Sequence, residues 1–337
     1  MEELSAAEVR RTGRGEWVGD AWVGVARGVW RSRDAADEVR AELRAWQRVL
    51  APAWVFTHLT AARLRGWWLP PLPHDLPVFV AAPRGTGRVR RPGLVAIRRS
   101  AAPEPEGLDG LRVDPAAEVL AACARDLSLL DLLCLVESAL AAGDCTLDDV
   151  RAVAARGGKG APRLRAACRM ARGDAESVWE VLLRELHRCA GAEVVAQHEV
   201  LDDQGRFLAR ADLWLVGTRT IHEYDGGDHL DVGQQRRDLR RARGLANEGW
   251  TRRGYAAQDV LHRGVRVLAD IDVALGRPHV PGRIRAWHEL LRDSLFTPSG
   301  TARLRARWTS DSSPRHARRP SGSGHSEWCE RPLNPSG

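Results

Sequence analysis

The alternation of apolar and polar residues in the C-terminal half of the chain predicts a helix followed by a sheet. Apolar residues at 178, 182, 183 and 186 recur at helical spacing within the segment 176–189. The following segments are predicted as strands at 193–201, 206–216 and 219–225, a helix at 232–248, a strand at 250–256 and a helix from residue 258. This order predicts an α/β (α+β) domain, residues 173–296, in which helices flank a sheet.

The middle of the chain, residues 101–172, is predicted to be helical. Asp114-Pro115 is a typical helix start, and Gly143 and Gly157-Gly158 are typical helix ends. The predicted helices are 116–124, 128–142, one that starts at Thr146, and 161–172. In the N-terminal region, residues 1–100, the pattern predicts a short strand or wing within 18–31, helices at 34–49 and from Thr57 to Gly66, and strands at 78–81 and 94–98.

Composition adds a few limits. A chain of 337 residues favours two or more domains. The longest apolar run, 127–142, is interrupted by Asp131 and Glu137, and the N-terminus is acidic and polar. We therefore expect a cytoplasmic protein with no membrane partner. Residues 297–337 are rich in Ser, Pro, Gly and Arg, and are predicted to be a disordered basic tail. Because this tail carries much of the net charge of +7, the charge is weak evidence for nucleic-acid binding.

The hairpin 206–225 carries the candidate chemistry. If Gly217-Thr218 forms a two-residue type II′ turn, the numbers of paired residues sum to 435. Asp212 then lies opposite Glu223, with Cβ atoms about 5 Å apart. Asp225 shares their face, opposite Arg210. Facing carboxylates repel, and a divalent cation with oxygen ligands, Mg²⁺ or Mn²⁺, offsets the repulsion. The alternative is an ordinary solvated polar face, which is the commoner case for hairpins in general.

Two further features accompany the acids. His229 follows Glu223 by six residues, beyond Gly226-Gly227, and an imidazole there can orient a water molecule or accept its proton. The predicted helix 232–248 is rich in arginine, and a basic helix beside the site is suited to bind phosphates. The candidate phosphate-binding residues are Arg236, Arg237, Arg240 and Arg241. A mixed-charge helix face is, however, more often merely solvated.

These motifs resemble a known family of nucleases. The run 175–184 (AESVWEVLLR), Ala211-Asp212-Leu213 and the run 223–229 (EYDGGDH) are similar to DUF559-type domains, relatives of the very short patch repair endonucleases in the PD-(D/E)XK superfamily. The resemblance implies a restriction-endonuclease-like mixed sheet flanked by helices, with Asp212 and Glu223 as metal ligands. It also implies that Glu180 approaches from the first helix, and that His229 matches the histidine of the repair enzymes.

The N-terminal region resembles a second family. Residues 25–30 (VARGVW) and 57–64 (THLTAARL) are similar to AbiEi antitoxin-like proteins, in which a winged-helix module precedes a helical region. Two functions follow from the two resemblances. One is a metal-dependent DNA endonuclease, and the other is a non-catalytic DNA-binding regulator with a degenerate nuclease scaffold. An RNA substrate stays open, and the sequence assigns no oligomeric state.

The chain departs from the nuclease pattern at one position. The lysine expected two residues after the second acid is Asp225, and Lys159 is the only lysine in the chain. The stabilisation of charge must therefore come from an arginine, from His229 or from no residue. By strand pairing, Arg210 is the nearest candidate. The expected catalytic set is Asp212, Glu223, Asp225, His229 and Glu180.

Overall fold

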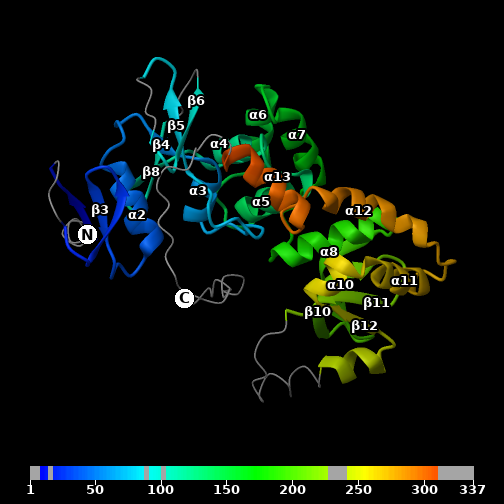
Figure 1. Ribbon diagram of the computed structural model, residues 1–337. Helices are drawn as coiled ribbons and strands as arrows, with labels where there is room; N and C mark the ends of the chain where they lie inside the picture. Colours follow the sequence, from blue (N-terminus) through cyan, green and yellow to red (C-terminus); the bar gives the residue numbers. More distant parts are fainter. Residues whose placement is uncertain (1–7, 14–17, 87–90, 100–103, 227–240, 310–337) are drawn as a thin grey trace.

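A computed structural model of the chain describes residues 8–13, 18–86, 91–99, 104–226 and 241–309. It is a mixed α/β structure, with sheets towards the two ends and a layer of helices between them (Figure 1). Within the described ranges, no helix is long and apolar enough to cross a membrane.

The N-terminal region contains two sheets. The first has the order β1-β3-β2 and packs on the helix α2 through Val9, Val29 and Ala45. The second has the order β6-β5-β4-β8-β7 and combines parallel with antiparallel pairs. The elements are β1 (Val9–Arg11), β2 (Trp22–Ala26), β3 (Val29–Ser32), α2 (Glu38–Gln47), β4 (Val55–Phe56), α3 (His58–Leu64), β5 (Val78–Pro83), β6 (Leu94–Arg99), β7 (Glu106–Leu108) and β8 (Leu111–Val113).

Several N-terminal elements lie where the sequence predicts them. The predicted strands 78–81 and 94–98 correspond to β5 and β6, and the segment 18–31 holds the hairpin β2–β3. The described helices α2 and α3 are separated by strand β4. The winged-helix interpretation of this region stays a prediction.

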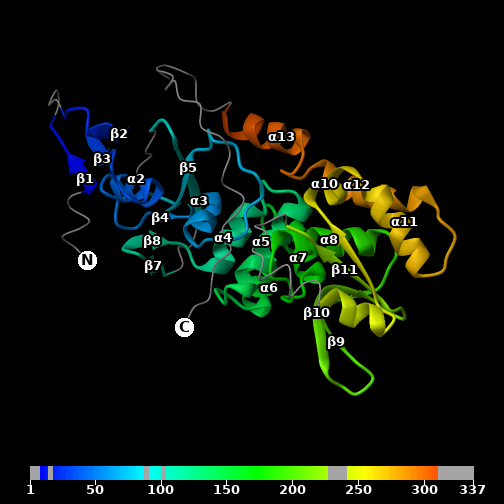
Figure 2. The ribbon, with the colours of Figure 1, turned by 90° about the horizontal axis from the view of Figure 1, so that it is seen from below.

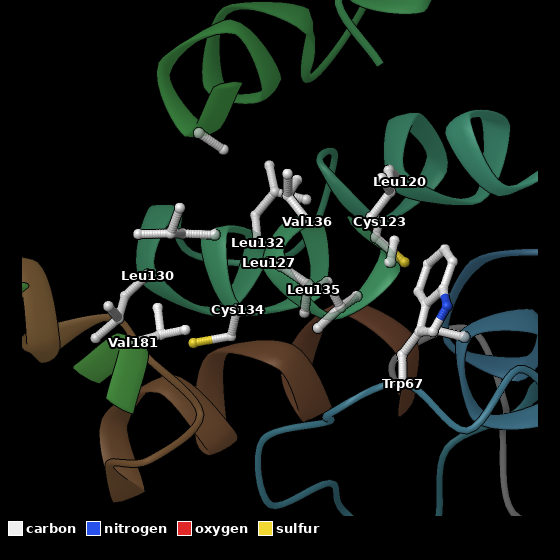
Figure 3. Packing of buried hydrophobic residues seen from close by; sticks show 14 of the residues in the cluster. Trp67, Leu120, Cys123, Leu127, Leu130, Leu132, Cys134, Leu135, Val136 and Val181 are labelled. Carbon is white, nitrogen blue, oxygen red and sulfur yellow. The ribbon is translucent and has the colours of Figure 1, made fainter. Parts of the chain in front are cut away.

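The four predicted central helices are present as α4 (Ala116–Cys123), α5 (Leu129–Ala141), α6 (Leu147–Ala155) and α7 (Ala161–Met170). Local capping explains two of their starts. Ser128 accepts the backbone N–H of Asp131, and Thr146 forms a reciprocal capping box with Asp149. Figure 3 shows α5 at the centre of the packing, with Leu130 and Cys134 near Val181 of the helix α8 (Val178–Cys189).

The C-terminal half is built on a four-stranded mixed sheet of order β12-β11-β10-β9. Strands β9, β10 and β11 are antiparallel, whereas β11 and β12 are parallel. Because a parallel pair needs a crossover, the chain returns through a helix that the structure describes at 241–247. The elements are α8 (Val178–Cys189), β9 (Val194–Leu201), β10 (Phe207–Leu215), β11 (Thr220–Tyr224), β12 (Thr251–Tyr255), α10 (Ala257–His262), α11 (Gly264–Ala274), η1 (Pro281–Ile284), α12 (Arg285–Arg292) and α13 (Pro298–Thr309).

Helices cover both faces of this sheet. Leu213 and Leu215 belong to the main core together with residues of α8, and His222 of β11 contacts His187 of α8. Ile221 instead joins a separate small core with Leu245 of the crossover helix. In Figure 2 the hairpin β9–β10 extends away from the rest of the molecule.

The prediction that the chain is disordered after residue 296 is wrong for Pro298–Thr309, which forms α13. This helix returns across the helical layer towards the N-terminal sheets (Figure 1). Leu304 is buried, Trp308 packs edge-on against Phe79, and Arg307 forms an ion pair with the buried Asp126. These partners lie far away in sequence, which is why local composition does not reveal the helix. The remainder of the predicted tail, 310–337, lies outside the described residues.

Candidate functional site

The hairpin β10–β11 has the predicted register. Leu213 pairs with His222 and Trp214 with Ile221, so paired numbers sum to 435. The turn differs from the prediction. The N–H of Thr218 donates to the carbonyl of Leu215, which makes Gly217 the third residue of the turn rather than the second. Gly217 has a φ of +79°, a conformation that glycine adopts without strain. The connection is therefore longer than two residues, but the pairing is unchanged.

This register places Asp212 beside Glu223 on neighbouring strands. The carboxylate of Asp212 accepts the backbone N–H of Tyr224 through Oδ2, at 2.8 Å. On the other side, the register of β9 and β10 places Gln197 opposite Asp212, and Gln197 has a left-handed φ of +51°. The backbone is therefore irregular at the position where the acid side chain bonds to the neighbouring strand.

Glu180 approaches the same place from the first turn of α8. Its Oε2 accepts the amide of Gln197 and its Oε1 accepts the hydroxyl of Ser177, each at 2.8 Å. Ser177 is the N-cap of α8 and in turn accepts the backbone N–H of Glu180. Burial raises the pKa of Glu180 despite these hydrogen bonds.

Asp212 has a strongly perturbed pKa. Its pKa is raised from 3.8 to about 6, mainly by burial and in addition by the neighbouring charges of Glu180 and Glu223. The N–H of Tyr224 and the charge of Arg241 act in the opposite direction. Burial and the neighbouring acids therefore disfavour ionised Asp212 more than Arg241 and the Tyr224 N–H favour it.

Glu223 has a different environment, since both of its oxygens contact arginines. It is 4% exposed, Oε1 bonds Arg241, and Oε2 bonds Nε of Arg252. Arg252 also donates from Nη2 to Asp225 Oδ1 at 2.7 Å. Burial acts to lower the pKa of Arg252, but the hydrogen bond and charge of Glu223 and the charge of Asp225 outweigh it and raise this pKa. Arg252 therefore bridges two of the predicted site acids.

The expectation that Arg210 serves Asp225 is wrong. The guanidinium of Arg210 binds Glu176 at 2.7 Å, and only its backbone carbonyl reaches the site, where it accepts a hydrogen bond from Arg241. Strand β12 lies parallel to β11, with Ile221 paired to Arg252. Arg252 is thus the cation that the sequence interpretation missed. The sequence feature that could have indicated this cation is the Arg252-Arg253 pair, which lies on the strand that follows the basic helix.

His229, Arg236, Arg237 and Arg240 lie outside the described residues. Arg241 lies within the described residues, and its guanidinium forms an ion pair with Glu223.

The donor set can be compared with the needs of a divalent cation. Within the described ranges, no three His, Cys, Asp or Glu side chains group as a metal site. Asp212 and Glu223 nevertheless offer carboxylate oxygens on adjacent strands, the ligand type that Mg²⁺ and Mn²⁺ prefer. The raised pKa of Asp212 shows that added positive charge would be favourable there. Two carboxylates therefore fit such an ion, which would compete with the arginines for Glu223.

Behind the sheet, two histidines form a buried pair. Nε2 of His187 lies 2.7 Å from Nδ1 of His222, and Nδ1 of His187 lies 2.7 Å from the carbonyl of Leu183. Burial lowers the pKa of His187 to about 4 and that of His222 to about 2. Both rings are therefore neutral at pH 7 and support β11 from its core side.

Comparisons of the chain with protein-family models, with curated proteins and with solved structures found no match.

Proposed function

We propose that this protein is a metal-dependent DNA endonuclease with a PD-(D/E)XK-type sheet in its C-terminal half. The observation that carries the proposal is the pairing of Asp212 with Glu223 across one hairpin, where the pKa of Asp212 is raised to about 6. A mixed sheet flanked by helices, with Glu180 reaching the acids from α8, supports the same interpretation. A perturbed acid in such a cluster is typical of functional sites.

In this proposal Asp212 and Glu223 hold Mg²⁺ or Mn²⁺. The bound ion would supply a Lewis acid for the scissile phosphate and a water molecule of lowered pKa. Arg241 and Arg252 are the described cations that can bind phosphate oxygens, because guanidinium donors match phosphate geometry. His229 is proposed to orient the attacking water, and Arg236, Arg237 and Arg240 to bind the DNA backbone.

The alternative function is a DNA-binding regulator whose nuclease-like half is a scaffold. One observation favours it, namely that both oxygens of Glu223 are already neutralised by arginines. A site of that kind can be stable without a metal. In this alternative the acids and arginines only hold the sheet together, and DNA binds elsewhere on the protein.

The experiment that separates the two is cleavage of supercoiled plasmid and of mismatched duplex DNA with Mg²⁺ or Mn²⁺. The variants are Asp212→Asn and Glu223→Gln, which preserve side-chain size. Arg210→Gln is the matched control, since its guanidinium pairs with Glu176 outside the acid pair. Metal-dependent nicking that both acid variants abolish and the control retains supports the endonuclease. Retained DNA binding without cleavage by wild type under either metal supports the regulator.

A further inference from the structure

The side chain of Arg252 has two acidic partners that differ in burial. Its Nε binds Glu223, whose side chain is 5% exposed, and its Nη2 binds Asp225, whose side chain is 51% exposed. The guanidinium itself is partly open, with 38% of the side chain exposed. Arg252 can therefore leave the buried acid while the exposed acid still holds it.

Glycine at 254 makes this second contact possible. A Cβ built on Gly254 would lie 1.6 Å from Oδ2 of Asp225, so the carboxylate occupies the space of a side chain. Gly254 and Tyr255 pair with Glu223 and Tyr224 in the parallel register, which brings β12 directly alongside the acids. The backbone N–H of Asp225 is also fixed, because it donates to the carbonyl of Tyr255 at 2.9 Å. The side chain of Asp225 therefore lies over β12 at Gly254, because any residue with a Cβ at position 254 would clash with this carboxylate.

The balance of charge shows what Arg252 does for the site. Glu180, Asp212, Glu223 and Asp225 are four acids, and Arg241 and Arg252 are the guanidiniums bonded to them in the described structure. In the described structure neither guanidinium forms an ion pair with Asp212. A cation that binds Asp212 and Glu223 together must take one oxygen of Glu223 from an arginine.

We propose that Arg252 is an exchangeable counter-ion of the site, an inference that rests on the proposed nuclease function. Without metal, Arg252 neutralises Glu223. With a divalent ion held by Asp212 and Glu223, Arg252 would leave Glu223 and stay attached to Asp225, and its Nε–H would be free to donate to a DNA phosphate. Asp225 is a positioning residue that holds the arginine in both states.

The exchange makes two measurements change in opposite directions. In Arg252→Gln, the ion no longer competes with a charged hydrogen bond, so Mn²⁺ measured without DNA binds about tenfold more tightly. The same variant loses a donor to the developing phosphate charge, so single-turnover cleavage at saturating Mn²⁺ slows by about a hundredfold. A residue that only stabilised the fold would weaken both processes when replaced.

Two further variants make the test specific. Asp225→Asn removes the tether but keeps the Arg252–Glu223 contact, so it slows cleavage and changes Mn²⁺ affinity less than threefold, by about RT or less. Arg253→Gln is the matched control for charge, because Arg253 is the exposed neighbour on the same strand. It should leave both measurements near the wild-type values.

The experiment combines Mn²⁺ titration followed by electron paramagnetic resonance with single-turnover cleavage of plasmid DNA. Tighter Mn²⁺ binding with slower cleavage in Arg252→Gln is the expected result. If wild type binds Mn²⁺ and cleaves DNA, but Arg252→Gln binds Mn²⁺ more weakly or cleaves at the wild-type rate, the exchange proposed for Arg252 is wrong. The proposed nuclease function would then still stand. Wild type that neither binds Mn²⁺ nor cleaves would overturn both. If Arg252→Gln fails to fold, Arg252→Lys, which cannot bridge two carboxylates in the same way, takes its place with the same expected signs.

Discussion

Replacing Asp212 with asparagine should stabilise the metal-free protein. The folded state raises the pKa of Asp212 to about 6, mainly through burial and then through the charges of Glu180 and Glu223. Asparagine has nearly the same shape and keeps an oxygen that can accept the N–H of Tyr224, which Asp212 bonds at 2.8 Å. The variant therefore removes an unfavourable charge without removing the hydrogen bond.

The size of the effect follows from the two pKa values. Because the folded-state pKa of about 6 lies above the ordinary 3.8, the folded protein binds more protons between these pH values. The contribution of Asp212 to stability is thus most favourable at low pH and is lost as pH rises through 6. At pH 8 the cost of the charge is about 3 kcal/mol, and at pH 5 it is about 1.5 kcal/mol. Asp212→Asn should increase the free energy of unfolding by these amounts.

Urea denaturation in EDTA at pH 5 and pH 8, with wild type and Asp212→Asn compared at each pH, measures this difference. Saturating Mg²⁺ should then stabilise wild type, by about 2.7 kcal/mol at a concentration of one hundred times Kd, and leave the variant unchanged. A variant no more stable than wild type at pH 8, or a difference that does not grow between pH 5 and pH 8, would refute the reasoning.

Glu223→Gln is the informative contrast. The facing acids alone suggest that replacing either one relieves repulsion. The structure predicts the opposite for Glu223, because Arg241 and Arg252 would lose their shared carboxylate. Removing one partner of a buried pair is costly, and partial exposure of these arginines reduces the loss to about 2 kcal/mol. The two acids should therefore give stability changes of opposite sign in the same urea experiment.

Three further predictions concern the packing around the site. The pKa of His187 in the folded state, about 4, lies below the ordinary 6.5, so burial of the neutral ring costs no stability above pH 6.5. The free energy of unfolding should then fall by about 3 kcal/mol as the pH is lowered to 4. Urea denaturation across this pH range should show a smaller fall for His187→Gln. Arg307→Ala leaves the buried Asp126 without its arginine, which should cost about 2 kcal/mol and increase hydrogen exchange in α13, whereas unchanged exchange would contradict the described docking. Glu137→Gln breaks the buried ion pair with Arg184 and should lower the free energy of unfolding by about 3 kcal/mol. The control is Arg151→Gln, which removes an exposed ion pair with Asp148 and should change the free energy of unfolding little.

The elements that the sequence could predict are those whose cause is local. Helix α6 begins where Thr146 and Asp149 cap each other, and α3 ends before Gly66, which has a φ of +71°. The register of β10 and β11 also follows from a short connection and from apolar positions that alternate along both strands. The facing positions of Asp212 and Glu223 were therefore predictable even though the type of the turn was not.

The ion pairs of the site were not predictable in the same way, because their partners come from different elements. Pairing within the hairpin suggested Arg210 for Asp225, but Arg210 turns to Glu176 near the start of α8. Arg252 reaches Glu223 and Asp225 only because β12 adds to the sheet in parallel beside β11. No spacing within the hairpin specifies that neighbour. The helix α13 was missed for the same reason, since its buried contacts are with Phe79 and Asp126.

The helical layer holds α8, and through it the candidate site, by a fully buried acid on α5. Glu137 binds Arg184 in the middle of α8 and accepts the backbone N–H groups of Arg172 and Gly173, which lead into that helix. One turn and a half earlier, Asp131 accepts the hydroxyl of Ser294 beyond α12. Because buried charges tolerate little displacement from their partners, α5 fixes α8 at both its approach and its centre. The position of Glu180 beside Asp212 therefore depends on the central helices, and a C-terminal fragment cut at residue 173 should lose the geometry of the site along with part of its core.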